Sequence, residues 1–201
     1  FHAWHSREHL PERLGIAGFN RGSRWQRGGG EFFVIYELES YETLTSDGYR
    51  ARLNDPTPWS KKMMPLHRDM IRSQCRVVAS NGGGVASFMT TIRLSPEDGS
   101  EVVLDACLRA AVLELPRRAG LTGAHLLRTQ TPAAAPTTEQ KIRGGDAVAD
   151  WILLASGHDA SALTELCATV LGAQALRDNG ANTLEYGELF RLVHVVTPQD
   201  L

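Results

Sequence analysis

A repeated eight-residue pattern constrains the fold of this chain more than any other feature. Residues 11–18 read PERLGIAG and residues 116–123 read PRRAGLTG, so Pro, Arg, Gly and Gly match at a single offset of 105 residues. This offset is about half of the 201-residue length. The pattern therefore predicts one structural unit that has been duplicated and fused, with a first unit at residues 1–84 and a second at residues 85–201.

The composition narrows the class of protein. A hydrophobic share of 42% and a charged share of 22% are typical of a globular chain. The net charge of -2 argues against a nucleic-acid partner and against a polybasic membrane-binding surface. The apolar runs are shorter than the roughly 18–20 residues that cross a bilayer. Cys75, Cys107 and Cys167 are scattered without a CxxC motif, which predicts reduced thiols and a cytoplasmic protein.

The order of predicted elements differs between the two halves. The second half reads as βαββαβ, with strands at 86–94, 124–129, 148–155 and 188–196 and helices at 101–115 and 160–177. The first half has helices at 1–14, 41–53 and 60–72 and strands at 19–26, 31–39 and 75–79. A ferredoxin-like unit opens with a strand. We therefore expect that the first unit lacks its opening strand because residues before Phe1 are missing. The alternative is a unit that is incomplete.

A duplicated βαββαβ unit resembles the dimeric α/β-barrel superfamily, in which two ferredoxin-like sheets pack into a barrel with helices outside. Residues 4–13 (WHSREHLPER), followed by Gly15 and Gly18-Phe19, are similar to the W-x-x-x-H-x-P pattern of its EthD-like members. The resemblance covers the first unit and reaches the second only through the repeat and the strand order. It implies an α+β fold of two fused ferredoxin-like units that form a pseudo-dimeric α/β barrel. It implies no single activity, because the superfamily includes monooxygenases, isomerases, cyclases and haem enzymes.

The first helix carries polar side chains on one face, namely His2, His5, Glu8 and His9. At the offset of 105 these positions align with a largely apolar stripe that we expect to face the sheet, namely Cys107, Ala110, Leu113 and Glu114, flanked by Val103 and Ala106. The polar face would then also point inward, where imidazoles and a carboxylate need a cavity or partners. His5, His9 and Glu8 are therefore candidate catalytic residues, and His9 comes first because the EthD-like pattern has a histidine there. The alternative is a set of solvated or hydrogen-bonded structural side chains.

Other residues of the first unit are candidates for ligand binding. Trp4, Trp25 and Tyr36 could form apolar walls of a pocket. Arg21 and Arg24 lie on the first strand, and an inward-facing arginine needs a carboxylate, which an acidic substrate could supply. The alternative is that these arginines are outward charges of a surface strand.

A metal site and a haem site have less support in the sequence. The string at residues 5–9 matches the H-x-x-E-H motif of some zinc proteases, but Pro11 truncates the helix and no third ligand is evident. We therefore expect no metal and no cofactor. His125 and His194 lie on strands of the second unit, and either could be an axial ligand if the protein bound haem.

A group of charged residues precedes the strand predicted at 148–155, and we expect it to be a solvated, ion-paired loop: Glu139, Lys141, Arg143, Asp146 and Asp150.

The leading functional hypothesis is that the first unit binds a small hydrophobic or aromatic molecule. Cofactor-free acid–base chemistry would then transform it by proton transfer, isomerisation, cyclisation or oxygenation. A hypothesis from a different class is a non-catalytic module that binds a ligand or uses its paired sheets for oligomerisation, for example as a homodimer. The third hypothesis is a haem-binding protein.

Overall fold

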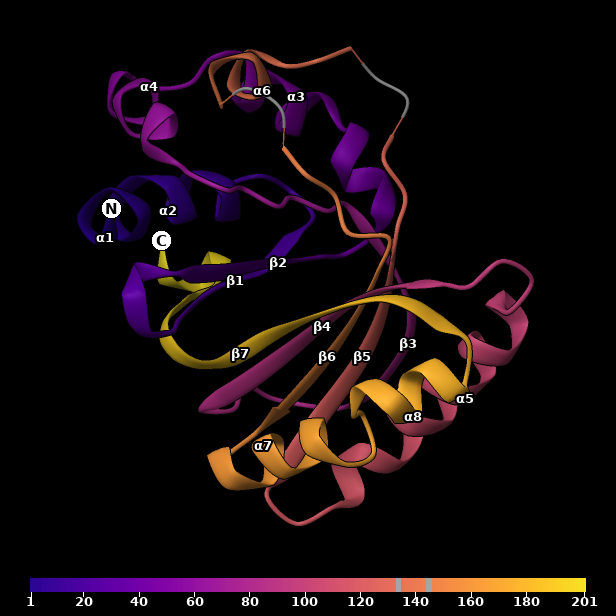
Figure 1. The fold of residues 1–201 in the computed structure, drawn as a ribbon. Helices are drawn as coiled ribbons and strands as arrows, with labels where there is room; N and C mark the ends of the chain where they lie inside the picture. The colour runs from indigo at the N-terminus through magenta and orange to yellow at the C-terminus, as the bar shows by residue number, and fades with distance from the viewer. Residues whose placement is uncertain (133–134, 144–145) are drawn as a thin grey trace.

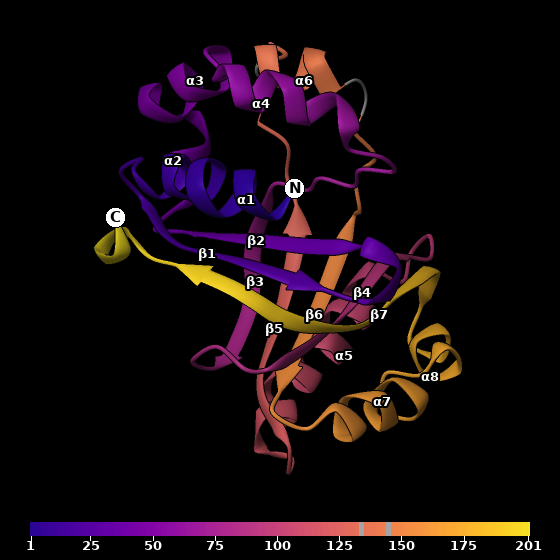
Figure 2. The same ribbon diagram turned by 90° about the vertical axis from the view of Figure 1, so that its left-hand side faces the viewer.

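One curled antiparallel sheet joins both halves of the chain in the computed structural model, which describes residues 1–132, 135–143 and 146–201, apart from the side chain of Glu188. Its strand order is β2-β1-β7-β4-β6-β5-β3. The strands are β1 (Phe19–Gln26), β2 (Phe32–Leu38), β3 (Cys75–Gly82), β4 (Phe88–Pro96), β5 (Leu121–Thr129), β6 (Trp151–Gly157) and β7 (Ala181–Val196). Figure 2 shows the β1, β2 and β7 part of the sheet crossing the β3, β5 and β6 part at a steep angle.

The second half of the chain has the ferredoxin-like arrangement. Its four strands lie in the order β7-β4-β6-β5, so the first and third strands of the unit are neighbours and the second and fourth lie outside them. The two halves exchange neighbours, because β1 pairs with β7 and β3 pairs with β5. These pairings confirm the predicted α+β fold, a dimeric α/β barrel built within one chain.

Helices cover the two ends of the curled sheet on opposite sides (Figure 1). On one side, α5 (Glu101–Glu114), α7 (Ala160–Ala168) and α8 (Ala173–Asp178) lie over β4, β5 and β6. On the other side, residues 2–14 lie against β1 and β7, and α3 (Asp47–Asn54), α4 (Pro58–Met63) and α6 (Thr138–Arg143) lie beyond them. No helix in the described part of the chain is long and apolar enough to cross a membrane.

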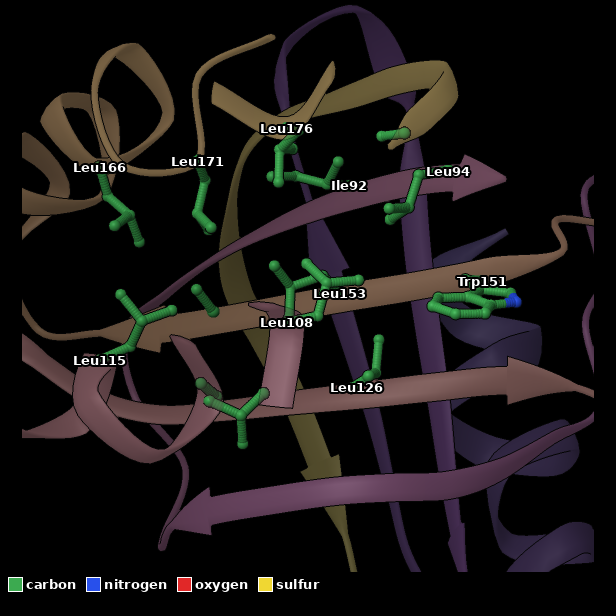
Figure 3. Close-up of a cluster of buried hydrophobic side chains, with 14 of the residues drawn as sticks. Ile92, Leu94, Leu108, Leu115, Leu126, Trp151, Leu153, Leu166, Leu171 and Leu176 are labelled. Atoms are coloured by element: carbon green, nitrogen blue, oxygen red, sulfur yellow. The ribbon is translucent and has the colours of Figure 1, made fainter. Parts of the chain in front are cut away.

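Within the described residues, three clusters of buried apolar side chains hold these layers together. The cluster beneath α5, α7 and α8 includes Leu108, Leu126 and Leu153 (Figure 3). The cluster beneath residues 2–14 includes Leu10 and Leu14. The third cluster lies within the curl of the sheet and includes Trp25, Met89, Ile152, Leu154 and Phe190. The sheet therefore has an apolar core on both faces.

The prediction of which face of α5 meets the sheet is wrong. The buried residues of this helix are Leu104, Leu108 and Val112, and Leu115 follows directly after its end. The stripe expected to be buried is largely exposed: Val103, Ala106, Ala110, Leu113 and Glu114. The helix has apolar residues on both faces, so periodicity alone does not identify the inner one. The leucine-rich face is buried because it removes more apolar area from water.

The first helix contains a π-helical turn between its two α-helical ends. The α-helical segments are α1 (His2–Trp4) and α2 (Leu10–Leu14), and the π turn η1 (His5–His9) joins them. A π turn bonds residue i to residue i+5 and so holds one residue more than an α turn. As a result Trp4 and His5 are buried while His2 is exposed.

Three predicted helices differ from the observed ones. The helix expected at 60–72 is instead α4, followed by a 3₁₀ turn at Met64–Leu66, because Pro65 cannot continue an α-helix. The helix expected at 41–53 is a 3₁₀ turn (Tyr41–Thr45) followed by α3, which Ser46 caps by accepting a hydrogen bond from the Tyr49 amide. The helix expected at 160–177 is divided into α7 and α8, and Gly172 is the N-cap of α8.

Close packing between β1 and the first helix makes Gly22 sensitive to substitution. A Cβ atom at Gly22 would lie 2.5 Å from Leu10 Cδ2 and 2.9 Å from Leu14 Cδ2, both on buried side chains. We expect Gly22→Ala to lower the free energy of unfolding by about 1–3 kcal/mol, as overpacking of a core does. Urea-induced unfolding measures this loss. Gly28→Ala is the control, since nothing lies within 4 Å of a Cβ there. Equal stabilities for the two variants would contradict the close approach.

Candidate functional site

The structure brings five of the eight predicted site residues to one layer, between the first helix and strands β1, β2 and β7. These are Trp4, His5, His9, Arg24 and Tyr36. Arg21 and Trp25 lie on the opposite face of β1, because alternate residues of a strand point to opposite faces. Arg21 there pairs with Glu37, and Trp25 packs in the cluster within the curl. Glu8 lies on the side of the helix that faces α4.

His5 lies between the first helix and β1, where it is 3% exposed. Its Nδ1 is 3.2 Å from Nη1 of Arg24, and a guanidinium can only donate. His5 Nδ1 therefore accepts the hydrogen bond, which places the ring proton on Nε2. Burial lowers the pKa of His5 to about 3, with Arg24 and His194 as further causes. His5 is consequently neutral at neutral pH.

His9 is a half-buried imidazole that packs against two other rings of the layer. Its ring stacks on Trp4 at 4.5 Å between centroids and lies 5.6 Å from the ring of His5. Burial lowers the pKa of His9 well below its ordinary value, and the nearby charge of Arg13 adds to this effect. Its Nδ1 is buried and has no hydrogen-bond partner among the described residues. His9 is thus a neutral imidazole with one unused nitrogen.

Glu8 links the π turn to the start of α4. Its Oε1 accepts hydrogen bonds from the hydroxyls of Thr57, at 2.5 Å, and Ser60, at 3.2 Å. Trp4 Nε1 donates to Ser60 Oγ at 3.1 Å, so the same serine contacts both residues of the helix. These bonds fix the orientation of the Trp4 ring and, through stacking, that of His9.

A buried ion pair between Arg13 and Glu139 closes the layer from the side of α6. Arg13 is 3% exposed and Glu139 is 1% exposed, and the Arg13 Nη2 donates to Glu139 Oε1. Arg143 lies 3.7 Å from the second oxygen of Glu139 and also pairs with Asp146. The prediction of a solvated loop is therefore wrong for Glu139 and Arg143. It fails because Arg13 lies 126 residues away in sequence, and α6 forms where the two meet.

Tyr36 and Glu12 complete the polar lining. Tyr36 comes from β2, and its hydroxyl is buried without a hydrogen-bond partner in the part of the chain that the structure describes. Burial raises the pKa of Tyr36, so it remains a neutral phenol. Burial also raises the pKa of Glu12, although Arg13 opposes this shift from 3.7 Å.

The sequence did not predict that buried polar atoms without hydrogen bonds are concentrated in this layer. Among the described residues, eight buried side-chain nitrogen or oxygen atoms lack a hydrogen-bond partner, and seven of them belong to this layer. They are on His9, Glu12 (both oxygens), Arg13, Arg24, Tyr36 and His194. An unpartnered buried polar group costs about 1–3 kcal/mol. Such a concentration marks a place where a polar molecule would find partners.

The positions of the histidine, cysteine and acidic side chains also test the metal hypothesis and locate the two histidines of the haem hypothesis. The described residues contain no group of three His, Cys, Asp or Glu side chains that could hold a metal ion. His125 and His194 are not brought together. His125 bonds to Ser80 Oγ at 2.8 Å, whereas His194 is paired in register with Arg24 in the layer under the first helix.

Solved structures with the same fold include oxidase-like and monooxygenase-like proteins. An anthrone oxidase-like protein superposes with a TM-score of 0.64 at 12% identity, covering 98% of this chain and 86% of that chain. A putative monooxygenase from Fusobacterium nucleatum has a TM-score of 0.59 at 8% identity, covering 98% and 87%. A monooxygenase-like protein from Listeria innocua has a TM-score of 0.50 at 9% identity, covering 94% and 87%.

These likenesses assign the chain to the ferredoxin-like, dimeric α/β-barrel fold class. No protein-family model and no curated protein sequence matches it.

Proposed function

We propose that the layer between the first helix and strands β1, β2 and β7 binds a small aromatic or otherwise hydrophobic molecule. His9 moves a proton of this molecule without the help of a cofactor. The observation that supports this most is the gathering, in one layer, of seven buried polar atoms that make no hydrogen bond within the described residues. Four of them, on His9, Arg24, Tyr36 and His194, also lie outside any ion pair of this part of the chain. The apolar part of the ligand would contact Trp4, which is 1% exposed and fixed by Ser60 and His9.

The protonation states of His9 and Tyr36 suit the two halves of an acid–base step. His9 is neutral, and its free nitrogen is open to a proton from an acidic C–H or O–H bond of the ligand. Burial makes His9 a weak base, and the negative charge left on the ligand beside the ring would offset this by stabilising the protonated imidazole. The electron pair of that bond stays on the ligand as an enolate or phenolate. Tyr36 keeps its proton and donates a hydrogen bond to the oxygen that becomes negative. Arg13, which influences both groups electrostatically, adds positive charge.

Two likenesses support the choice of ligand class. The names of the similar structures, anthrone oxidase-like protein and putative monooxygenase, fit the transformation of small molecules. The EthD-like pattern of residues 4–13 falls on the helix that carries the site, and we propose this relationship as well. In this proposal Glu8 acts as a positioning residue, because both of its hydrogen-bond partners belong to the start of α4.

A ligand screen tests the proposal. Phenols, aromatic ketones and aromatic acids are first ranked by the rise in melting temperature that they cause. The dissociation constants of the hits are then measured by calorimetry on the wild type, His9→Gln and His158→Gln, where His158 is the exposed control. We expect His9→Gln to weaken binding by about tenfold, equivalent to ~1.4 kcal/mol, and to abolish any isomeric product separated by chromatography.

Two outcomes would overturn the proposal. One is a screen in which no compound of these classes binds. The other is a set of hits that bind all three proteins equally well, because the ligand would then lie elsewhere. Binding that depends on His9 without any product would retain the site and remove the proton transfer.

A further inference from the structure

Arg24 is a buried cation without a counter-ion. It is 4% exposed, and no carboxylate lies within ion-pair distance of it in the described part of the chain. Its Nη1 bonds to His5, which is neutral, and its Nε is buried without a partner among the residues described. A buried charge is costly unless it is paired. Arg13, which is equally buried, forms an ion pair with Glu139. Arg24 therefore departs from the rule that a buried charge is paired.

His194 adds a second unused group beside Arg24. The two residues are paired across β1 and β7. The Nε2 of His194 is buried and lacks a partner within the described residues. Burial lowers the pKa of His194, and Arg24 is the next cause, so the two side chains act on each other. A neutral imidazole can donate one hydrogen bond, and a guanidinium edge can donate two.

Two acidic side chains, one on the first helix and one that influences His194, are already engaged. Glu8 accepts hydrogen bonds from the hydroxyls of Thr57 and Ser60. Asp200, which influences His194, accepts hydrogen bonds from the amide and hydroxyl of Thr197 at 2.7 and 2.8 Å. The charge of Arg24 is therefore available to an anion that comes from outside the chain.

The surroundings of Arg24 indicate the rest of such a ligand. The Phe1 ring lies 5.9 Å from the Arg24 guanidinium carbon, and the rings of Phe1 and Phe32 are 4.4 Å apart. Both phenylalanines are half-buried, so an aromatic surface that is partly open to solvent begins beside Arg24. An apolar ring attached to the anion would meet aromatic side chains on its way to Arg24.

We propose that the ligand of this site is a carboxylic acid with an aromatic or hydrophobic body, and that Arg24 and His194 bind its carboxylate. Arg24 Nε donates to one carboxylate oxygen and His194 Nε2 to the other, while His5 holds the far side of the guanidinium. This inference rests on the proposed function and names the substrate class of the same site. It also assigns a role to His194, which the proton-transfer step does not use.

The test compares benzoate with benzamide, which has almost the same shape and no charge. Dissociation constants are measured by calorimetry on the wild type, Arg24→Met and Arg21→Met. Arg21→Met is a matched control, because Arg21 lies on the other face of the same strand and pairs with Glu37. We expect the wild type and Arg21→Met to prefer benzoate by about tenfold or more, and Arg24→Met to show no preference.

A stability measurement separates this role from a structural one. Because Arg24 has no carboxylate partner among the described residues, we expect Arg24→Met to retain or gain stability without ligand. A structural arginine would instead lose stability on replacement. Arg24→Lys keeps the charge without the fork of donors, and it should retain part of the benzoate preference.

The results distinguish the two proposals. Equal binding of benzoate and benzamide by the wild type, absence of benzoate binding, or a benzoate preference that survives in Arg24→Met overturns the acid-binding inference. If neutral phenols still bind in a manner that depends on His9, the proposed function stands even though the acid-binding inference has failed. A benzoate preference that depends on Arg24 but is indifferent to His9→Gln supports the carboxylate site and removes the proton-transfer step.

Discussion

Glu139→Gln will lower the free energy of unfolding by about 3–5 kcal/mol, because it leaves the buried guanidinium of Arg13 without its main anion. Glu12 lies 3.7 Å from Arg13 and cannot replace a direct hydrogen bond. Urea-induced unfolding followed by circular dichroism measures the loss. The matched control is Glu114→Gln, which breaks the exposed pair with Arg117 and should cost no more than about 1 kcal/mol.

The double variant Arg13→Met/Glu139→Leu extends this test. It removes both charges and replaces them with apolar groups of similar length, so we expect it to recover much of the lost stability. Equal losses for Glu139→Gln and Glu114→Gln would show that the pair between the first helix and α6 is not buried in solution.

Acid will destabilise the protein strongly, because His5 and His9 are buried as neutral rings. Their pKa values lie below the ordinary 6.5 in the folded state, at about 3 for His5. Between pH 3 and pH 6.5 the unfolded chain therefore binds more protons than the folded protein does. The stabilising effect is therefore complete above pH 6.5 and is lost as the pH falls toward 3. His5 contributes a slope of about 1.4 kcal/mol per pH unit within this window, and His9 adds to the slope in the same direction.

Urea titrations between pH 4 and pH 7 check this slope. In His5→Gln the amide oxygen can still accept the hydrogen bond of Arg24, but the side chain no longer titrates. In this variant we expect the slope of the free energy of unfolding against pH to fall by the contribution of one titrating group, about 1.4 kcal/mol per pH unit. A variant with the slope of the wild type would show that His5 is solvated or charged in the folded protein.

The sequence predicts elements well where their patterns are local. The strand expected at 19–26 is β1, and the helix expected at 101–115 is α5 with one residue fewer. The fold class followed from the repeat and from the βαββαβ order of the second half. The start of β7 at Ala181 was missed, since its first residues form a strand by pairing with β4 and carry no clear alternation of their own.

The candidate site was predicted in part. His5 and His9 lie on the inner side of the first helix as predicted, whereas His2 is exposed and Glu8 faces α4. The argument from α5 used the wrong face of that helix. The pairing of Arg24 with His194 and that of Arg13 with Glu139 were not foreseen, because each joins residues more than 120 positions apart. Residues 131–138 form a segment rich in Pro, Ala and Thr, which is typical of a loop, so α6, which begins at Thr138, was also missed. Residues 133–134 of that segment lie outside the described part of the chain.

The position of β7 has a consequence for how the protein is made. β1 is complete after residue 26, but it pairs with β7 through residues 191–196. A ribosome will therefore have released the first strands long before their partner exists, and the open edge of β1 will be exposed during most of synthesis. Contacts of such long sequence separation also slow folding. The first helix packs on one face of β1 and can cover that face before β7 arrives, but the edge that pairs with β7 stays open until then.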